Sequence, residues 1–129
     1  MVKITLPLPS AKLSPNARLH WAAKAKAVKQ HRLTAKLICS ATGVGFESPV
    51  RFASYHLHFF WPDNRRRDRD NATARCKAYL DGIADAIGQD DSEWSFDGVR
   101  TDVDKGRPRL EICFEVQVDK SDDGGTLPL

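Results

Sequence analysis

The chain has 129 residues, of which 41% are hydrophobic and 29% are charged, proportions that are typical of one globular domain and argue against a disordered or fibrous chain. No apolar run approaches the roughly 18 residues that a membrane span requires. Three cysteines in no C-x-x-C arrangement argue against a disulfide scaffold and a structural zinc site. With an N-terminus that lacks a signal-peptide core, these features predict a reduced, cytoplasmic protein.

The charge is distributed unevenly along the chain. Residues 1–46 contain 8 Lys and Arg and no Asp or Glu, whereas residues 47–129 contain 12 Lys and Arg and all 17 acids. The formal charge is therefore +8 for the first segment and −5 for the second, which sum to the net charge of +3. A second basic cluster lies within the acidic part and consists of Arg65, Arg66, Arg67, Arg69, Arg75 and Lys77. Basic clusters attract polyanions by Coulomb forces and counterion release. Two such clusters favour binding to a phosphate backbone over a merely solvated lysine face.

The first half of the chain predicts a strand, a loop and a long helix. Residues 2–8 (VKITLPL) alternate and are rich in β-formers, and residues 10–16 contain the Pro, Ser and Asn of a loop. From about residue 18 to residue 40 the chain is rich in Ala and Lys and lacks Gly and Pro, which predicts a helix. Its expected core face repeats at three- and four-residue steps and consists of Trp21, Ala25, Val28, Arg32, Ala35 and Cys39.

The next predicted strand covers residues 50–61 (VRFASYHLHFFW) and ends at Pro62. Strict alternation places Phe52, Ser54, His56, His58 and Phe60 on one face. The opposite face then carries Ala53, Tyr55, Leu57, Phe59 and Trp61.

A second helix is predicted from an N-cap at Asp70 or Asn71 to about Ile87, with Gly88 as its stop. Its expected core face consists of Cys76, Leu80, Ile83 and Ile87. Two further strands are predicted at residues 94–103 and 109–118. The order β-α-β-α-β-β predicts one α+β domain around a mixed sheet with two main helices, spanning residues 1–119, followed by a mobile polar tail at residues 120–129.

The segment between the central strand and the second helix carries the candidate chemistry. Asp68 and Asp70 are two residues apart, so in an extended backbone their carboxylates leave on the same side, and Asp90 and Asp91 follow the helix. Carboxylates beside arginines, without a Cys/His set, suit Mg²⁺ rather than zinc and can activate water at a phosphate. The same alternation also fits an exposed strip of ion pairs, with Asp70 or Asn71 as a helix cap.

The predicted helix separates these acids along the chain. Its ~17 residues span about 25 Å. Asp91 can therefore share a site with Asp70 only if residues 88–93 fold back or if the sheet brings the start of the next strand beside residues 50–61.

The run at residues 62–71, P-D-N-R-R-R-D-R-D-N, resembles the P-D-x-R-R-R-D-x-D-N signature of the RusA-like Holliday junction resolvases. Further segments that fit are the I-T-L-P strand, Ser14-Pro15-Asn16, K-A-x-x-D at residues 77–81, Asp90-Asp91, and K-G-x-x-R-L-E at residues 105–111. The resemblance covers roughly residues 3–118.

The resemblance implies a RusA-like fold and a homodimeric crossover junction endodeoxyribonuclease. Such an enzyme binds four-way DNA junctions and nicks two opposed strands symmetrically, with Mg²⁺ as its metal and Mn²⁺ as a possible substitute. It implies branched DNA and a second copy as partners, no membrane and no small-molecule cofactor, in a bacterial or phage context.

The resemblance also assigns site residues. The metal-binding acids would be Asp68, Asp70 and Asp91, with Asp90 as a neighbouring alternative. The family's D-N-x-x-K spacing would place the catalytic lysine at position 74, where this chain has Ala74. The candidate in this chain is Lys77, with Arg75 as its alternative. The nucleic-acid contacts would come from Arg65, Arg66, Arg67, Arg69, Arg75, Lys24, Lys26 and Asn16.

Two other functions fit the sequence. A non-catalytic nucleic-acid-binding module of the same fold would use both basic clusters and would need the acids only as caps and ion-pair partners. A small protein-interaction domain would dock its basic helix on an acidic partner. Neither alternative requires clustered carboxylates beside arginines.

Overall fold

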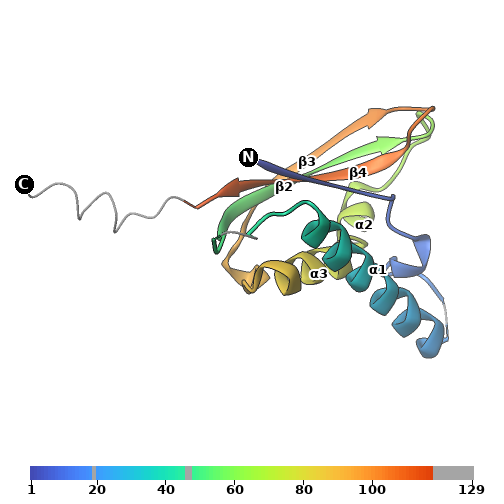
Figure 1. The fold of residues 1–129 in the computed structure, drawn as a ribbon. Coiled ribbons are helices and arrows are strands. Elements are labelled where there is room, and N and C mark those ends of the chain that lie inside the picture. Colours follow the sequence, from blue (N-terminus) through green and yellow to red (C-terminus); the bar gives the residue numbers. More distant parts are fainter. Residues whose placement is uncertain (19, 46–47, 118–129) are drawn as a thin grey trace, which may run out of the picture.

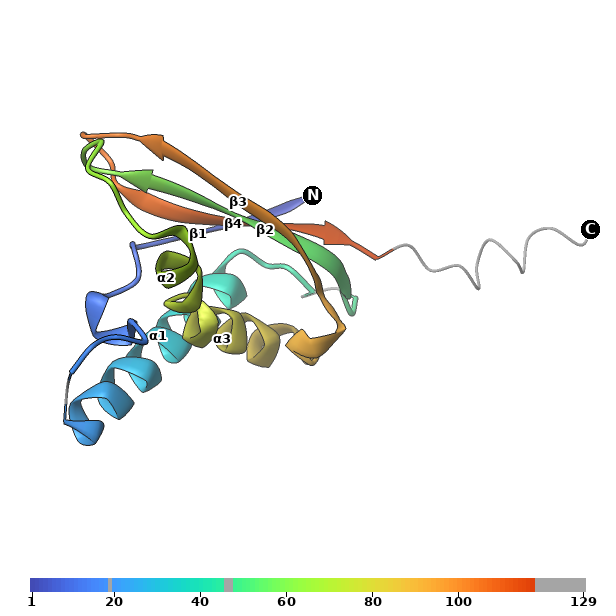
Figure 2. The ribbon, with the colours of Figure 1, turned by 180° about the vertical axis from the view of Figure 1, so that it is seen from behind.

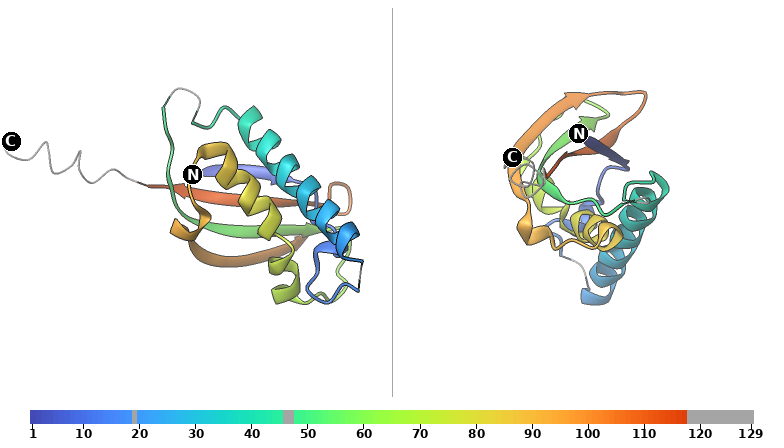
Figure 3. Two further views of the ribbon diagram at one scale, coloured as in Figure 1. Left: turned by 90° about the horizontal axis from the view of Figure 1, so that it is seen from below. Right: turned by 60° about the vertical axis from the view of Figure 1, so that its left-hand side comes forward.

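The computed structural model describes residues 1–18, 20–45 and 48–117 and contains a four-stranded sheet with helices packed on one face (Figure 1; Figure 3, left). The main elements are β1 (Val2–Leu6), α1 (Trp21–Ala41), β2 (Phe52–Trp61), α2 (Arg69–Ala74), α3 (Lys77–Ile87), β3 (Ser95–Val103) and β4 (Arg109–Val116). Two short 3₁₀ helices are η1 (Ala11–Leu13) and η2 (Asp91–Glu93). The predicted α+β class and element order are confirmed, and the predicted tail at 120–129 lies outside the described residues.

The sheet is mixed, with the strand order β1-β4-β2-β3. β4 pairs antiparallel with both β1 and β2, whereas β2 and β3 are parallel. A parallel pair requires a crossover connection, and α2 and α3 supply it across one face of the sheet, as the view from behind shows (Figure 2). The chain therefore leaves the sheet after Trp61 and returns beside the other end of β2, where Ser95 pairs with Ser54.

β2 departs from strict alternation at its start. Leu57 and Phe59 share one face, as predicted, and this face is the helix-covered one, on which both are fully buried. Phe52 is also fully buried and stacks on Phe114, with ring centroids 4.2 Å apart, so the prediction that it shares the face of His56 and His58 is wrong. The pairing with β4 shifts between Phe52 and Ser54, and one extra residue in a strand transfers a side chain to the other face.

Only part of the predicted core face of α1 is buried. Ala35 and Cys39 are fully buried, but Trp21 is 76% exposed and Val28 is 37% exposed, so the prediction is wrong for the first half of the helix. The physical reason is that the first turns of α1 extend past the sheet (Figure 1), and the helix packs chiefly on α3.

The contact between α1 and α3 is unusually close at Gly82. A β-carbon at this position would lie 2.1 Å from the backbone oxygen of Arg32 and 3.0 Å from the Ala35 Cβ. The two helix backbones can approach to this distance only because Gly82 has no side chain. α1 and α3 consequently lie side by side over the same face of the sheet (Figure 3, left).

The second predicted helix is two helices. α2 ends at Ala74 and α3 begins at Lys77, because the Cys76 N–H donates to the carbonyl of Thr73, a three-residue bond that tightens the turn. The N-cap of α2 is Asp68, whose Oδ1 accepts from the Asn71 N–H at 3.1 Å, so the prediction of a cap at Asp70 or Asn71 is wrong. Gly88 ends α3 with φ 71°, as predicted.

Candidate functional site

Lys77 contacts two carboxylates at the start of α3. Its Nζ donates to Asp81 Oδ1, one turn later on the same helix, at 2.9 Å, and to Asp91 Oδ2 in η2 at 2.6 Å. The hydrogen bond to Asp91, followed by that to Asp81, raises the pKa of Lys77, so the side chain is an ammonium ion at neutral pH. Two carboxylates from different elements therefore converge on one cation.

The chain after α3 returns beside the start of β2, which is the second of the two routes considered for Asp91, but it brings Asp91 to Lys77 and not to Asp70. The buried side chain of Gln89 pairs with the backbone of Phe52: its Oε1 accepts from the Phe52 N–H at 2.7 Å, and its Nε2 donates to the Phe52 carbonyl at 2.9 Å. The Gln89 side-chain amide thus pairs with Phe52 in the way that the backbone of one more β3 residue would. It thereby fixes the chain two residues before Asp91.

The structure separates the roles of Asp90 and Asp91. Asp90 is the N-cap of η2, and the hydrogen bond from the Ser92 N–H, at 2.9 Å, holds its pKa below the ordinary value. Asp91 is the neighbour whose carboxylate contacts Lys77.

Asp68 and Asp70 do not share an extended backbone. Asp68 caps α2 with extended dihedral angles (φ −74°, ψ 115°), but Asp70 lies exposed in the first helical turn, so the geometry in which both carboxylates leave on the same side is not present. Among residues 1–18, 20–45 and 48–117, no three Asp, Glu, His or Cys side chains form a group that could hold a metal ion.

A hydrogen-bonded network joins the Ser14-Pro15-Asn16 loop to α2. Asn71 Nδ2 donates to Ser14 Oγ at 2.8 Å, and Arg75 Nε donates to Asn71 Oδ1 at 3.0 Å. The backbone N–H of Asn16 also donates to Ser14 Oγ, at 3.2 Å. Of the two residues considered for the lysine position, Arg75 thus contacts Asn71 whereas Lys77 contacts the acids.

The arginines of residues 65–69 differ in their environment. The Arg67 guanidinium donates to Asp63 Oδ1 at 2.8 Å and to the carbonyls of Asp63 and Arg65 at 3.0 Å, and it lies 4.4 Å from the ring centroid of Trp61. The hydrogen bond from the Arg65 N–H and that from Arg67 hold the pKa of Asp63 below its ordinary value. Arg67 therefore organises the loop, while the side chains of Arg65, Arg66 and Arg69 are exposed.

One lysine of α1 lies in the region around Arg75 and Lys77. Lys24 of α1, Arg75 and Lys77 line a groove of about 310 Å³, whose other walls come from η1 and α3. Lys26 is exposed on α1 and is not part of the groove lining. Of the two α1 lysines predicted to bind nucleic acid, Lys24 is the one that lies beside Lys77.

Two residues of this region were missed by the sequence analysis as site residues. Asp81 had a local signal, because a carboxylate four residues after a lysine lies on the same side of a helix. Gln89 had none, since its partner is the backbone of a strand that lies 37 residues earlier.

Comparison with known proteins gives a relative but no assigned activity. No protein-family model matches this chain. A protein of Xylella fastidiosa (strain Temecula1 / ATCC 700964), described as an uncharacterized protein, is 46% identical to it over 93 residues. The match covers 70% of this chain and 61% of that relative, so less than two thirds of the relative's length is represented. In the part of the chain that the structure describes, no helix is both long and apolar enough to cross a membrane.

Proposed function

We propose that this chain is a RusA-like, Mg²⁺-dependent endodeoxyribonuclease that resolves four-way DNA junctions by paired nicks. The observation that carries the proposal is the 2.6 Å contact between Lys77 Nζ and Asp91 Oδ2. The two residues are 14 positions apart, and the resemblance assigns both of them to one site. Their contact supports the assignment because a stretch of unrelated sequence gives no reason for this pair to meet.

The oxygen donors around Lys77 fit a hard divalent cation. Asp81 and Asp91 already share one cation, the Lys77 ammonium, whose side chain is 66% exposed and therefore accessible to a bound phosphate. Asp91 and Asp81 would hold the ion, and the Asp68 and Asp70 carboxylates, which do not form one group with them in the described residues, would have to move toward it. When bound, Mg²⁺ would activate a water molecule and offset the negative charge that develops at the attacked phosphate.

The basic side chains would bind and orient the DNA. Arg65 and Arg66 project from the loop after β2, and Arg69 projects from the first turn of α2. Guanidinium groups bind phosphate oxygens through paired, charge-assisted hydrogen bonds. Lys24 and Arg75 would extend this positive surface along the groove toward α1. Lys77, as an ammonium ion at the acids, would stabilise the charge on the phosphate that is cut.

Paired nicks require two sites. One site cuts one strand, so a two-fold dimer that faces a nearly two-fold junction would produce symmetric cuts. Recognition would depend on the branched shape and on phosphate positions more than on base edges.

The test is cleavage of a synthetic four-way junction, beside a linear duplex of the same sequence, with Mg²⁺ and with EDTA. We expect symmetric, Mg²⁺-dependent nicks on the junction alone. Asp70→Asn should abolish cutting and leave junction binding intact, because it removes a metal ligand and no phosphate contact. The matched control is Asp97→Asn, an exposed aspartate of β3, which should cut at the wild-type rate.

The proposal fails if wild-type protein cuts no junction with either Mg²⁺ or Mn²⁺. If Asp70→Asn cuts at the wild-type rate, the assignment of the metal site is wrong.

A second candidate is a non-catalytic nucleic-acid-binding module of the same fold. It is favoured by the fact that Lys77 already forms ion pairs with Asp81 and Asp91, and that no three-ligand metal group occurs within the described ranges. It predicts junction binding with a steep salt dependence and no cleavage with either metal.

A further inference from the structure

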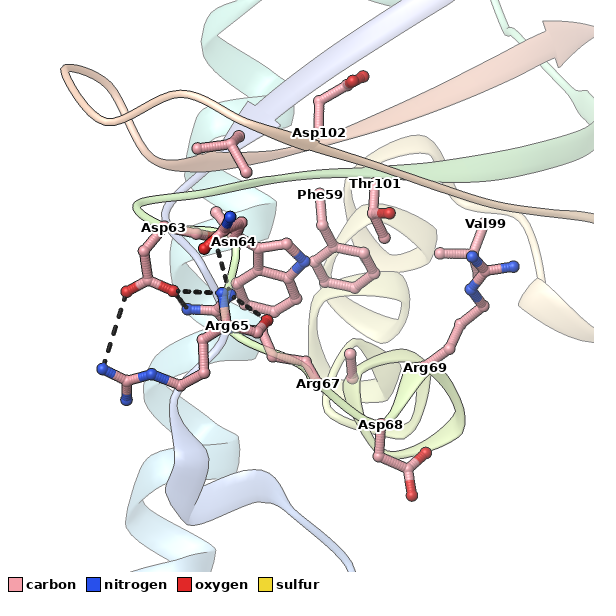
Figure 4. Close-up of a pocket in the computed structure, with 13 residues that line it drawn as sticks. Phe59, Asp63, Asn64, Arg65, Arg67, Asp68, Arg69, Val99, Thr101 and Asp102 are labelled. Carbon is pink, nitrogen blue, oxygen red and sulfur yellow. Dashed lines mark hydrogen bonds and ion pairs between the residues drawn. The ribbon is translucent and has the colours of Figure 1, made fainter.

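A pocket of about 250 Å³ lies beside the arginine loop, on the helix-covered side of the sheet (Figure 4). We name it the β3 pocket. Its walls come from the ends of β2 and β3, the loop after β2 and the start of α2. α1 and α3 contribute no residue to this lining, so this end of the core-facing surface is left uncovered, and Val103 is 52% exposed.

The floor and one wall of the β3 pocket are apolar and planar. Phe59, Ala72 and Val99 supply apolar surface. Trp61 stacks on Phe59 with an interplanar angle of 1°, and its indole ring also carries the Arg67 guanidinium at 4.4 Å. Since three hydrogen bonds attach that guanidinium to the loop, the wall is rigid before any ligand arrives.

The opposite wall and the rim are polar. Arg69 extends alongside Val99, and Thr101 and Asn64 also line the pocket, whereas the carboxylate of Asp68 points away from it (Figure 4). Within the described residues Arg69 forms no ion pair, so its planar guanidinium is available to stack on a ligand. A hydroxyl and an amide provide donors and acceptors for a ligand edge.

A planar heterocycle suits these walls. Guanidinium and indole groups stack on flat π-systems, and the faces of nucleobases are a common ligand of such surfaces. The same loop supplies Arg65 and Arg66 for phosphates, so a base in the pocket would remain joined to a backbone on that loop.

We propose that the β3 pocket binds one unstacked nucleobase of the DNA strand that is to be cut. This inference rests on the proposed function, since it requires DNA as the ligand. A base must leave its stack to enter, and this is easiest for a base that is already unpaired. The pocket would therefore favour branch points, where pairing is interrupted, over continuous duplex.

The test measures binding alone, in EDTA, by fluorescence anisotropy of a duplex with one unpaired base and of the same duplex fully paired. Val99→Phe should fill the pocket and weaken binding of the unpaired-base duplex about tenfold, the typical loss of one stacking contact. Its affinity for the paired duplex should stay unchanged. Ser95→Phe, which adds the same ring at the far end of the same strand, should bind both duplexes as wild type does.

A thermal melt accompanies each variant. If Val99→Phe fails to fold, Val103→Phe blocks the pocket from its exposed end. The inference is overturned if a folded blocking variant binds the unpaired-base duplex as tightly as wild type, even when wild-type protein cuts junctions. If the blocking variants lose the preference for the unpaired-base duplex but wild-type protein never cuts a junction, the inference of a base-binding pocket is retained and the nuclease proposal fails.

Discussion

Replacing Gln89 should release the loop that brings Asp91 to Lys77. The Gln89 amide makes two hydrogen bonds to the backbone of Phe52, at 2.7 and 2.9 Å, and the side chain is buried. Gln89→Leu keeps most of the volume and removes both hydrogen bonds. The N–H and the carbonyl of Phe52 are then left without partners in a buried place.

The magnitude follows from these two groups. Each unpaired buried backbone group costs about 1–3 kcal/mol, so we expect a loss of unfolding free energy of about 3 kcal/mol once water has reached part of the site. In a chain of 129 residues this corresponds to a fall in Tm of about 10 °C.

Urea denaturation gives the free energy, and hydrogen exchange at the Phe52 amide shows whether its hydrogen bond is lost. Gln30→Ala, at an exposed glutamine of α1, is the matched control and should leave Tm unchanged. The reasoning is refuted if Gln89→Leu melts with the wild type and the Phe52 amide remains protected. Under the proposed function, Gln89→Leu should also slow junction cleavage more than it weakens junction binding, because it displaces Asp91 and touches no phosphate.

Two further predictions concern the packing of α1 on α3. Gly82→Ala should lower the unfolding free energy by about 2 kcal/mol, because a clash at 2.1 Å with the Arg32 carbonyl outweighs the gain of about 1 kcal/mol in helix propensity. Gly106→Ala, whose added Cβ would lie 3.9 Å from its nearest neighbour, is the control. An unchanged urea midpoint for Gly82→Ala would contradict this account. Arg32 holds the pKa of Asp85 below its ordinary 3.8 through a hydrogen bond. This pair therefore stabilises the fold above about pH 4, and its contribution falls as the pH falls through the folded pKa. In urea titrations, the difference in stability between wild type and Asp85→Asn should shrink from about pH 5 to about pH 3, and a constant difference would exclude the linkage.

The strands and their order along the chain could be predicted from the sequence because their signals are local, whereas their order in the sheet was not predicted. Alternation over residues 50–61 and 109–118 identified β2 and β4, and Leu57 and Phe59 share a face as expected. Gly88 predicted the end of α3, since few other residues adopt its positive φ.

The errors in the fold have tertiary causes. The register shift that buries Phe52 depends on its pairing with β4. The exposure of Trp21 depends on where the sheet ends beneath α1. No pattern within either segment carries this information.

The candidate site was predictable in part. The sequence singled out Lys77 and Asp91 but could not choose between Asp91 and Asp90, because the choice depends on which of them caps η2. It counted Arg67 among the DNA contacts, whereas the structure uses its guanidinium within the loop, through Asp63 four residues earlier.

The break between α2 and α3 separates two kinds of spacing along the chain. α3 is fixed in place by Gly82 against α1, and Gln89 anchors the chain that follows it, so the interval from Lys77 to Asp91 is rigid. The interval from Asp70 to Lys77 runs through a short helix and a tight turn, and it is attached to the core through Ala72 and Cys76. Under the proposed function, Lys77 meets Asp91 although it stands three residues after the position that the D-N-x-x-K spacing indicates. In an alignment of such chains, the position of the lysine would then be measured from the acid that follows it, and not from the acids that precede it.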